Sequence, residues 1–580
     1  MSTRTFAGLP IQYGGGPQCS GLGGCQGKPL PGAPRCLHHA EAAEKDTYFA
    51  TLNPGAVVDH RGTVIDSADL QRLCAVLTDP TSGHAVMHTA TFAWARFVGK
   101  ADFTGVEFSG RSVFQAAVFE GPALFGGTVF SGDAVFSQAE FLDARHGPVF
   151  SRSHFEAAAD FRRTTHQGEA NFDQVQFAKG ALFGEAQFAA TGRFSRCAFA
   201  GAAEFHGAEF KEAVFAGAEF HAARELGVLV CTDNLNLAEA QFHAPVQIRA
   251  VAHKVNATKT IWHAQASLVL RYATIDLAYA NLAAPFAINH APNAWGGTNT
   301  AEARLIAAHP EVTDLPKPTC LRGVDAGHVV LTDCDVSQCL FDGAFHLDQI
   351  QLRGNIRFAQ PPAGRRWTRR NTVIEEHYWR RLKYTGWNPP THPTPIRDQP
   401  GPEDVAALYR QLRKSMEDAK DESGAADFYY GEMEMRRHDS RASRSERRLL
   451  SLYWLFSGYG LRASRALYCL LAAMTLTLLL LLLVGLPNDA PDPQTTGTLT
   501  GNTIQVTTKT PDPVLNLPLH ARFTGERSKK AAIVVVNSVV FKSSGQNLTF
   551  VGTVIEMLSR ISEPVLLGLA ALAVRGRLKR

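Results

Sequence analysis

The clearest pattern in this chain is a phenylalanine that returns at alternating steps of five and six residues, giving a period of eleven. The pattern runs from Phe92 to Phe220, with a three-residue insertion near His146 and with His166 in place of one Phe. A small residue stands two positions before most of these phenylalanines: Ala95, Ala101, Val106, Ser112, Ala123, Ala134, Ala159, Ala170, Ala181 and Ala203. A fixed short period of this kind predicts a solenoid of stacked repeats.

Two kinds of structure can carry an eleven-residue period. A right-handed coiled coil needs apolar residues at steps of three and four, and frequent glycines such as Gly99 and Gly105 oppose a long helix. In a strand, residues i and i−2 point to the same face. Each Phe and its small partner then point inward, while polar residues such as Glu107 point outward. The pattern therefore predicts short strands separated by tight turns.

Segments such as residues 101–105 (ADFTG) and 134–138 (AVFSQ) resemble the pentapeptide-repeat family. The resemblance implies a mainly β fold, a right-handed parallel β-helix with a quadrilateral cross-section. The extra residue in every second repeat predicts about twenty-two residues per coil, with a bulge at a corner and a rise of about 4.8 Å per coil. Each coil buries its phenylalanines against its neighbours, so stability is quasi-one-dimensional.

The repeat weakens after Phe220 but continues in segments such as residues 273–275, 334–336 and 339–341, so we expect one solenoid with a looped, degenerate middle. An apolar-periodic stretch near Asp66 to Leu77 predicts a helix that covers the open N-terminal edge. The predicted segments are 1–45 (Gly/Pro/Cys-rich), 46–91 (capping), 92–360 (β-helix), 361–402 (Pro/Arg-rich linker), 403–465 (juxtamembrane helices), 466–487 (first transmembrane helix), 488–530 (extracytoplasmic loop) and 531–580 (re-entrant or second transmembrane segment with a basic end).

The overall charge is nearly balanced. The chain has 58 Lys+Arg and 54 Asp+Glu, a net charge of +4 that implies no bulk affinity for nucleic acid. Some pentapeptide-repeat proteins resemble duplex DNA and block gyrase, which requires a strongly acidic surface. Residues 92–225 contain 16 Asp+Glu against 12 Lys+Arg, a bias too weak for that role. We expect no nucleic-acid partner.

The ten cysteines are expected in a reducing compartment. The first sixteen residues lack the apolar core of a signal peptide, so the bulk of the chain is expected in the cytoplasm, where disulfides are rare. Cys197, Cys334 and Cys339 fall on small inward repeat positions, where a cysteine acts as a small buried side chain.

Four possible metal ligands stand close together in the Gly/Pro-rich N-terminal segment. Cys19, Cys25, Cys36 and His39 form a Cys3His set, which suits tetrahedral Zn²⁺, and His38 could replace His39. Such a segment cannot bury a core of its own, so bound zinc would supply its folding energy. With four protein ligands the site would be closed and structural. The alternative is a tail with incidental cysteines.

The composition becomes helical after the linker, in which Arg365, Arg366, Arg369 and Arg370 surround Trp367. Val405, Leu408, Leu412 and Met416 form one apolar helix face, Glu422–Gly424 is expected to break the helix, and Ala425 to Arg437 is a second helix. This stretch resembles the juxtamembrane hairpin of bacterial, particularly actinobacterial, membrane-bound pentapeptide-repeat proteins. Its acidic residues Asp427, Glu432 and Glu434 are interpreted as an ion-paired or solvated face and not as a catalytic pair.

A candidate transmembrane segment follows. Ala466 to Leu486 is apolar and uncharged, long enough to cross a bilayer. Many arginines precede it, which places its N-terminal side in the cytoplasm. Tyr453, Trp454 and Tyr459 are expected at the membrane interface. A second span must begin near Val551 and would place Glu556, Arg560 and Glu563 at membrane depth. These features predict a multi-pass protein of the inner cell membrane with a large cytoplasmic N-terminal part.

Ala531 to Phe541 is apolar but too short to span, so it could be re-entrant. The order of span, short apolar helix and second span resembles a two-helix ion-channel pore, which some bacterial pentapeptide-repeat proteins carry. Residues 542–549 (KSSGQNLT) stand where a TVGYG filter would be, so potassium selectivity does not follow.

No Walker A, HExxH, GxSxG or kinase motif occurs in the sequence, and a solenoid of identical rungs offers no obvious deep cleft. We therefore expect a non-enzymatic, membrane-anchored scaffold that binds a protein partner through its solenoid faces, forms a homo-oligomer and takes no small-molecule substrate. The alternative is an oligomeric, degenerate two-helix pore or transport component with a cytoplasmic β-helix.

Overall fold

The computed structural model describes residues 19–21, 25–295, 299–363, 369–387, 400–488, 493–500, 503–509 and 511–578. Arg365 to Trp367 and most of the proline-rich stretch before Pro402 lie outside the described residues. The chain forms two compact units, Met1–Pro400 and Gly401–Arg580, and each is described by itself.

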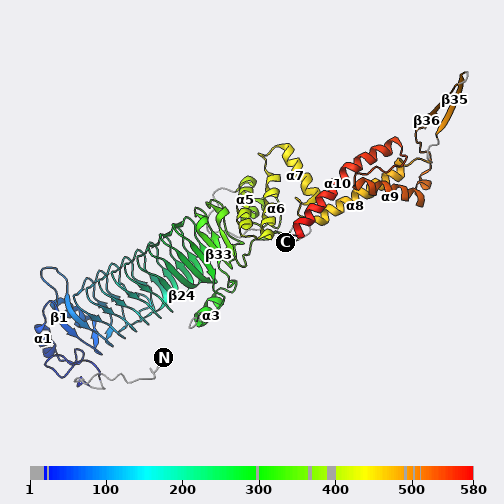
Figure 1. Cartoon of the computed structure of the whole chain (residues 1–580). Coiled ribbons are helices and arrows are strands. Elements are labelled where there is room, and N and C mark those ends of the chain that lie inside the picture. The colour runs from blue at the N-terminus through cyan, green and yellow to red at the C-terminus, as the bar shows by residue number, and fades with distance from the viewer. Residues whose placement is uncertain are drawn as a thin grey trace. The chain divides into compact units, whose positions relative to one another are not determined.

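The first unit is a parallel β-solenoid of about 12 turns, which confirms the predicted fold class (Figure 1). One large sheet contains β1 (Ala56–Asp59), β3 (Val86–Thr91), β6 (Glu107–Phe108), β7 (Ser112–Val113), β10 (Val129–Phe130), β11 (Ala134–Val135), β13 (His154–Phe155), β14 (Ala159–Asp160), β17 (Gln176–Phe177), β18 (Ala181–Leu182), β20 (Ala198–Phe199), β21 (Ala203–Glu204), β23 (Glu219–Phe220), β25 (Gln241–Phe242), β27 (Ile261–Trp262) and β30 (Asn281–Leu282).

The second large sheet contains β2 (Val64–Asp66), β4 (Arg96–Val98), β8 (Val118–Phe119), β12 (Glu140–Phe141), β15 (Thr165–His166), β16 (Ala170–Asn171), β19 (Gln187–Arg193), β22 (Glu209–Val214), β24 (Glu225–Asn236), β26 (Val246–Asn256), β28 (Ala266–Arg271), β29 (Thr274–Asp276), β31 (Phe286–His290), β32 (Lys317–Cys320), β33 (Val329–Thr332) and β34 (Gln351–Arg353). Strands β5 (Ala101–Asp102) and β9 (Ala123–Leu124) pair with each other.

The inward phenylalanines form four columns of stacked rings, one for each side of the coil. Phe103 stacks on Phe125 with centroids 5.0 Å apart, and Phe125 stacks on Phe150 at 4.8 Å. Phe108 pairs with Phe130, which stands two eleven-residue periods further along the chain, so the predicted coil length is confirmed here. The inward chains are fully buried, which gives this part an almost purely aromatic core.

The corners explain the alternation of five and six. At the five-residue steps from Phe92 to Phe205, the second residue after the Phe adopts a left-handed conformation, as at Ala116 (φ 51°) and Arg163 (φ 59°). The six-residue steps fall at the other two corners and carry the additional residue. At one of them, a Cβ on Gly121 would lie 2.4 Å from the carbonyl oxygen of Gly99, so the stacked chains approach too closely for a side chain.

The predicted looped, degenerate middle is confirmed only in part: a looped insertion that carries α3 (Asn299–Ala308) follows β31, but the coils before it are regular. Residues 225–290 form regular coils with longer strands, and Trp262 pairs with Leu282, so a coil here contains twenty residues. Register shifts between β19 and β26 remove the additional residues. The inward positions of these coils are mainly aliphatic, as at Ile248 and Leu268. The pattern weakens in the sequence because its Phe is replaced, not because the coil ends.

The first unit also contains short helices. They are α1 (Ala42–Thr51), α2 (Ser67–Val76), α3 (Asn299–Ala308), α4 (Ile374–Arg380) and the 3-10 turns η1 (Ala326–His328) and η2 (Leu347–Gln349). Helix α2 is the predicted helix before the Phe repeat, and Asp66 caps it by accepting from the Asp69 backbone N–H. Helix α3 belongs to an insertion between β31 and β32, and Leu305 packs it against Val230 and Val251.

The second unit begins with two antiparallel helices, α5 (Pro402–Asp418) and α6 (Glu422–His438). The predicted face of α5 is buried. The expected break at Glu422–Gly424 is wrong, because Asp421 accepts from the Gly424 N–H and starts α6 there. The acidic face of α6 is ion-paired as predicted: Glu432 pairs with Arg410 at 3.0 Å and Arg413 at 3.1 Å.

The rest of the second unit contains α7 (Arg444–Ser457), α8 (Ala463–Leu480), the π-helical turn η3 (Leu481–Gly485), the antiparallel hairpin β35 (Gln494–Thr500) and β36 (Thr503–Lys509), η4 (Leu519–Arg522), α9 (Gly525–Val539) and α10 (Phe550–Leu578). Two helical segments, Ala463–Gly485 and Phe550–Val574, are long and apolar enough to cross a membrane. They touch at Gly552, where a Cβ would lie 2.3 Å from the Gly485 carbonyl oxygen.

Candidate metal centre

The N-terminal segment folds against the first coil through backbone hydrogen bonds. The Lys28 N–H donates to the Arg61 carbonyl at 2.8 Å, and the Leu30 N–H donates to the Arg35 carbonyl at 2.9 Å. A turn then begins at Cys36, whose carbonyl accepts from the His39 N–H at 3.0 Å. These bonds hold a short Gly/Pro-rich segment in place although it has few apolar side chains.

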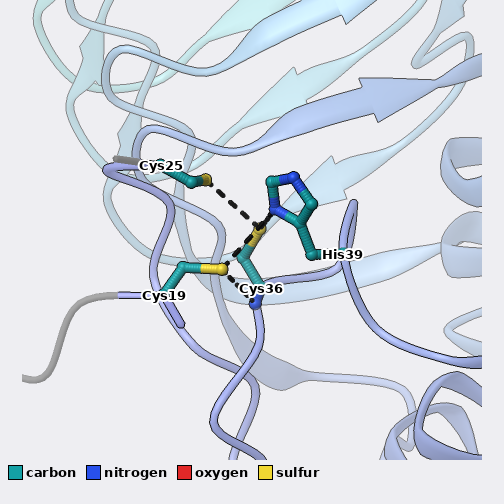
Figure 2. Close-up of side chains that lie close together, drawn as sticks. All are labelled: Cys19, Cys25, Cys36 and His39. Atoms are coloured by element: carbon teal, nitrogen blue, oxygen red, sulfur yellow. Dashed lines mark hydrogen bonds between the residues drawn. The ribbon is translucent and has the colours of Figure 1, made fainter. Parts of the chain in front are cut away.

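The four predicted ligands converge. The sulfurs of Cys25 and Cys36 lie 3.7 Å apart, and the Nδ1 atom of His39 lies 3.5 Å from the Cys36 sulfur and 3.6 Å from the Cys19 sulfur (Figure 2). All four ligand atoms lie within 4.8 Å of one another. A tetrahedral zinc with Zn–S of about 2.3 Å and Zn–N of about 2.05 Å separates two sulfurs by about 3.8 Å and a sulfur from a nitrogen by about 3.5 Å. The observed spacings match these values.

Backbone N–H groups point at two of the sulfurs. Cys19 accepts from the backbone of Cys36 at 3.2 Å and of Gly21 at 3.3 Å, and Cys25 accepts from Gly27 at 3.3 Å. Burial opposes ionisation of Cys19, but these two backbone donors outweigh it and lower its pKa to about 7. Burial raises the pKa of Cys36 to about 12. N–H donors of this kind support thiolate ligands, so the surroundings of the cluster fit a thiolate-bound cation.

The cluster has the features of a closed site. His39 takes the fourth position, and His38 lies beside it with the ring centroids 4.9 Å apart, outside the set. The three cysteines carry free thiols, so no disulfide joins any two of them. Four protein ligands leave no open position for a substrate, so a metal here would act on folding and not on chemistry.

A second histidine cluster was not predicted. His253 of β26 and His309, just after α3, stack with ring centroids 3.8 Å apart, and Glu311 lies within ligand distance of both. The rings are almost parallel, at 3°, so their in-plane nitrogen lone pairs do not converge on one point. The sequence holds no signal for this pair, because the α3 insertion alone brings the two residues together.

A groove of about 430 Å³ lies between α3 and the second large sheet. Gln167, Lys211 and Arg304 are among the residues that line it. The sequence predicted no deep cleft in the solenoid, and the groove arises because the α3 insertion projects over the coils.

The second unit buries a carboxyl at predicted membrane depth. Glu563 of α10 is 0 % exposed, and its Oε1 atom accepts from the Thr477 hydroxyl of α8 at 2.9 Å. The Oε2 atom has no hydrogen-bond partner among the described residues. Nearby, Glu556 pairs with Arg560 at 3.3 Å. Such a residue inside an apolar helix pair is costly and marks a candidate functional position.

Residues 150–197 match the family model described as pentapeptide repeats (9 copies). No curated protein and no solved structure matches the chain at a significant level. The matched residues include the coils around Phe150 and Phe172, whose rings stack with centroids 4.9 Å apart.

Proposed function

We propose that this protein is a membrane-anchored, non-enzymatic scaffold whose cytoplasmic β-solenoid binds a protein partner. The observation that carries the proposal is the combination of a long pentapeptide-repeat solenoid with two helices of spanning length in one chain. Only 22 % of the apolar window in the first span and 33 % in the second is buried within the protein. A core helix of a soluble protein would bury most of that surface, whereas lipid would cover it here.

Anchoring is tested by alkaline carbonate extraction of membranes that contain the full chain. We expect the protein to remain in the pellet, and a chain ending at Pro400, before the second compact unit, to be released. Recovery of the full chain in the supernatant would overturn the anchoring. Protease added from outside should cleave within residues 488–530 and leave the solenoid intact, because arginines precede the first span.

The groove beside α3 is the proposed contact surface for the partner. It combines basic, acidic and amide side chains with apolar ones, a composition that suits a polar protein surface. Purification of the full chain from its native membrane in mild detergent should yield a stoichiometric second protein. Lys211→Glu should weaken its recovery, whereas Arg145→Glu, an exposed arginine outside the groove, should not. Equal recovery from both variants would exclude the groove.

Zinc is proposed as the structural ion of the Cys19, Cys25, Cys36 and His39 cluster, on the strength of the tetrahedral spacings. Metal analysis of the purified chain should give one zinc per chain, and Cys36→Ser should abolish it. Cys231→Ser, a buried cysteine of the solenoid, is the matched control and should keep the metal. A chain without stoichiometric zinc, folded normally, would overturn the assignment.

The second candidate function is an oligomeric pore or transport component, and Glu563 favours it. A buried carboxyl with one unpaired oxygen between two candidate spans is a feature that a simple anchor does not need. The purified homo-oligomer in liposomes would then show ion flux that Glu563→Ala changes and Arg560→Lys does not. Tight liposomes that contain a verified oligomer would exclude the pore.

A further inference from the structure

Helix α7 presents a stripe of side chains whose polarity changes along its length. The stripe lines a cavity of about 680 Å³ and consists of Arg444, Arg447, Arg448, Ser451, Leu452 and Leu455. These positions follow one another at steps of three, one, three, one and three, which places them on one helix face. The N-terminal half of the face is basic and the C-terminal half is apolar, with a hydroxyl between them.

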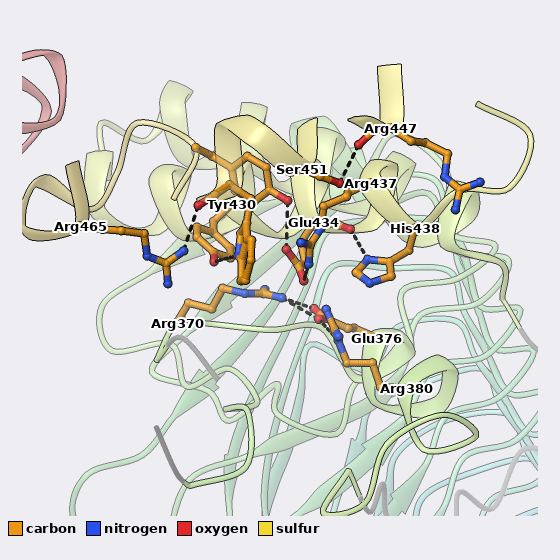
Figure 3. Close-up of polar contacts among 12 residues, drawn as sticks. Arg370, Glu376, Arg380, Tyr430, Glu434, Arg437, His438, Arg447, Ser451 and Arg465 are labelled. Atoms are coloured by element: carbon orange, nitrogen blue, oxygen red, sulfur yellow. Dashed lines mark hydrogen bonds and ion pairs between the residues drawn. The ribbon is translucent and has the colours of Figure 1, made fainter. Parts of the chain in front are cut away.

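The opposite face of α7 is fixed to α6. Leu450 packs with Tyr430 and Met433, and the Trp454 indole N–H donates to the Tyr430 hydroxyl at 3.1 Å. Figure 3 shows Tyr430, Glu434 and Arg437 of α6 beneath α7. The predicted interface position of Tyr459 is wrong, because this side chain is 1 % exposed and its hydroxyl donates to Glu434 at 3.1 Å. The side chains that α7 leaves exposed are arginines, leucines and two serines, Ser445 and Ser451.

The basic residues of this face have no acidic partner within the described chain. Arg444, Arg447 and Arg448 are exposed, and no described carboxylate forms an ion pair with any of them. Arg437, the one lining residue from α6, pairs with Glu434 at 2.7 Å and lies over the Trp454 ring at 4.4 Å. Arg436 of α6 is by contrast paired with Glu446 at 2.7 Å. Three unpaired guanidinium groups at one cavity fit an anionic ligand.

The apolar half of the face points to the kind of anion. Leu452 and Leu455 are 50 % and 51 % exposed, and Leu449 on a neighbouring stripe is 67 % exposed. The stripe is about 16 Å long from Arg444 to Leu455, at about 1.5 Å per residue. Its apolar end leads through the turn at Gly458 to Ala463, where the first candidate span begins.

We propose that the α7 face binds one anionic phospholipid, with its phosphate on Arg444, Arg447 and Arg448 and its first acyl segment on Leu452 and Leu455. The positive charge of the three arginines complements the phosphodiester of the lipid. The Ser451 hydroxyl then lies beside the glycerol group, and the two leucines contact the first part of the acyl chain. A free phosphate would use only the basic half, and a zwitterionic lipid would gain less from three cations. The site rests on the proposed membrane anchoring and defines which lipid the anchor selects.

The test measures binding of short-chain phosphatidylglycerol to the purified full-length protein in neutral detergent. We expect saturable binding that exceeds phosphatidylcholine of the same chain length, and about fivefold weaker binding for each of Arg447→Gln and Arg448→Gln. The control is Arg441→Gln, which removes the same charge just before α7 but outside the cavity, and it should bind like the wild type. Leu452→Gln should weaken the lipid but leave glycerol phosphate unchanged.

Each outcome decides the proposal. Equal binding of the two lipids would overturn it, because the charge of the headgroup would then not matter. Equal loss in Arg441→Gln would overturn it as an effect of general surface charge. Glycerol phosphate binding as tightly as the lipid would overturn it in favour of a soluble phosphate ligand. Because the measurement is made in detergent, it is independent of carbonate extraction, so failure of the lipid site and failure of membrane anchoring are distinguishable.

Discussion

The early coils of the solenoid (β4 to β23) and its late coils (β26 to β31) fill their cores with different side chains. From β4 to β23 the core is four columns of Phe rings, and most coils contain two eleven-residue periods, as between Phe108 and Phe130. From β26 to β31 the core is mainly aliphatic, and a coil contains twenty residues, as between Ile248 and Leu268. The coils with aromatic rings at all four inward positions are thus two residues longer than the mainly aliphatic coils. The comparison teaches that the core side chains and the coil length change together.

The largest expected effect is the loss of one ring from the early coils. Phe150 lies between Phe125 and Phe172 at centroid distances of 4.8 and 4.9 Å, so Phe150→Ala should leave a cavity and cost about 3–5 kcal/mol. Hydrogen exchange of the full chain should show lost protection around residues 125–172 and little change in β26 to β31, because coils contact only their neighbours. Phe345→Ala, at a site 61 % exposed, is the control and should change nothing.

A substitution in the late coils tests whether the length of a coil depends on the size of its core side chains. Leu268→Phe inserts a ring into one of the shorter late coils, between Ile248 and Ile288, and overpacking should cost about 1–3 kcal/mol. The same ring belongs naturally in the longer early coils. Chemical denaturation should show destabilisation of the late coils only. If Leu268→Phe is neutral, the late coils have room for rings and the proposed link between ring size and coil length is wrong.

His166 takes the place of a phenylalanine in its column of stacked rings. Its ring centroid lies 4.9 Å from that of Phe141 and 4.4 Å from that of Phe188. Burial lowers its pKa from 6.5 to about 3. The unfolded chain therefore takes up the proton first, so this contribution to stability is complete above pH 6.5 and is lost as the pH falls toward 3.

His166→Phe should remove that acid-dependent loss and also the buried Nδ1 atom, which has no partner among the described residues. We expect a gain of about 1–3 kcal/mol, since an unsatisfied buried polar atom carries that cost. The measurement is the free energy of unfolding at pH 7.5 and 4.5. The exposed His206→Gln should keep the wild-type pH dependence, and an identical pH dependence in His166→Phe would contradict the assignment.

The smallest effect concerns the five-residue corners. Ala116 adopts φ 51°, a left-handed conformation that costs an L-residue about 1–2 kcal/mol and glycine almost nothing. After the larger flexibility of glycine in the unfolded chain is subtracted, Ala116→Gly should stabilise the early coils by about 1 kcal/mol or less. Ala134→Gly in β11 is the control and should destabilise by about 0.5–1 kcal/mol. Thermal unfolding of both variants decides the sign.

The sequence by itself determined the solenoid, the length of its early coils and the inward cysteines. Cys197 is fully buried at its inward position, as its place two residues before Phe199 predicts. These features follow from sequence because each coil contacts the next at a fixed offset, so a local period is also a spatial contact. The two candidate spans could also be predicted from the sequence, since length and hydropathy are properties of a single helix.

Only the tertiary structure decided the contacts between residues that are not separated by a fixed number of positions in the sequence. The choice of His39 over His38 depends on the turn that begins at Cys36, and the His253–His309 stack depends on how the α3 insertion returns to the coils. The position of Tyr459 in the α6–α7 core depends likewise on packing between helices. In each case the residues in contact are separated in the sequence by a distance that no repeat sets. Packing between the segments decides which side chains meet, and a periodic pattern in the sequence does not contain that information.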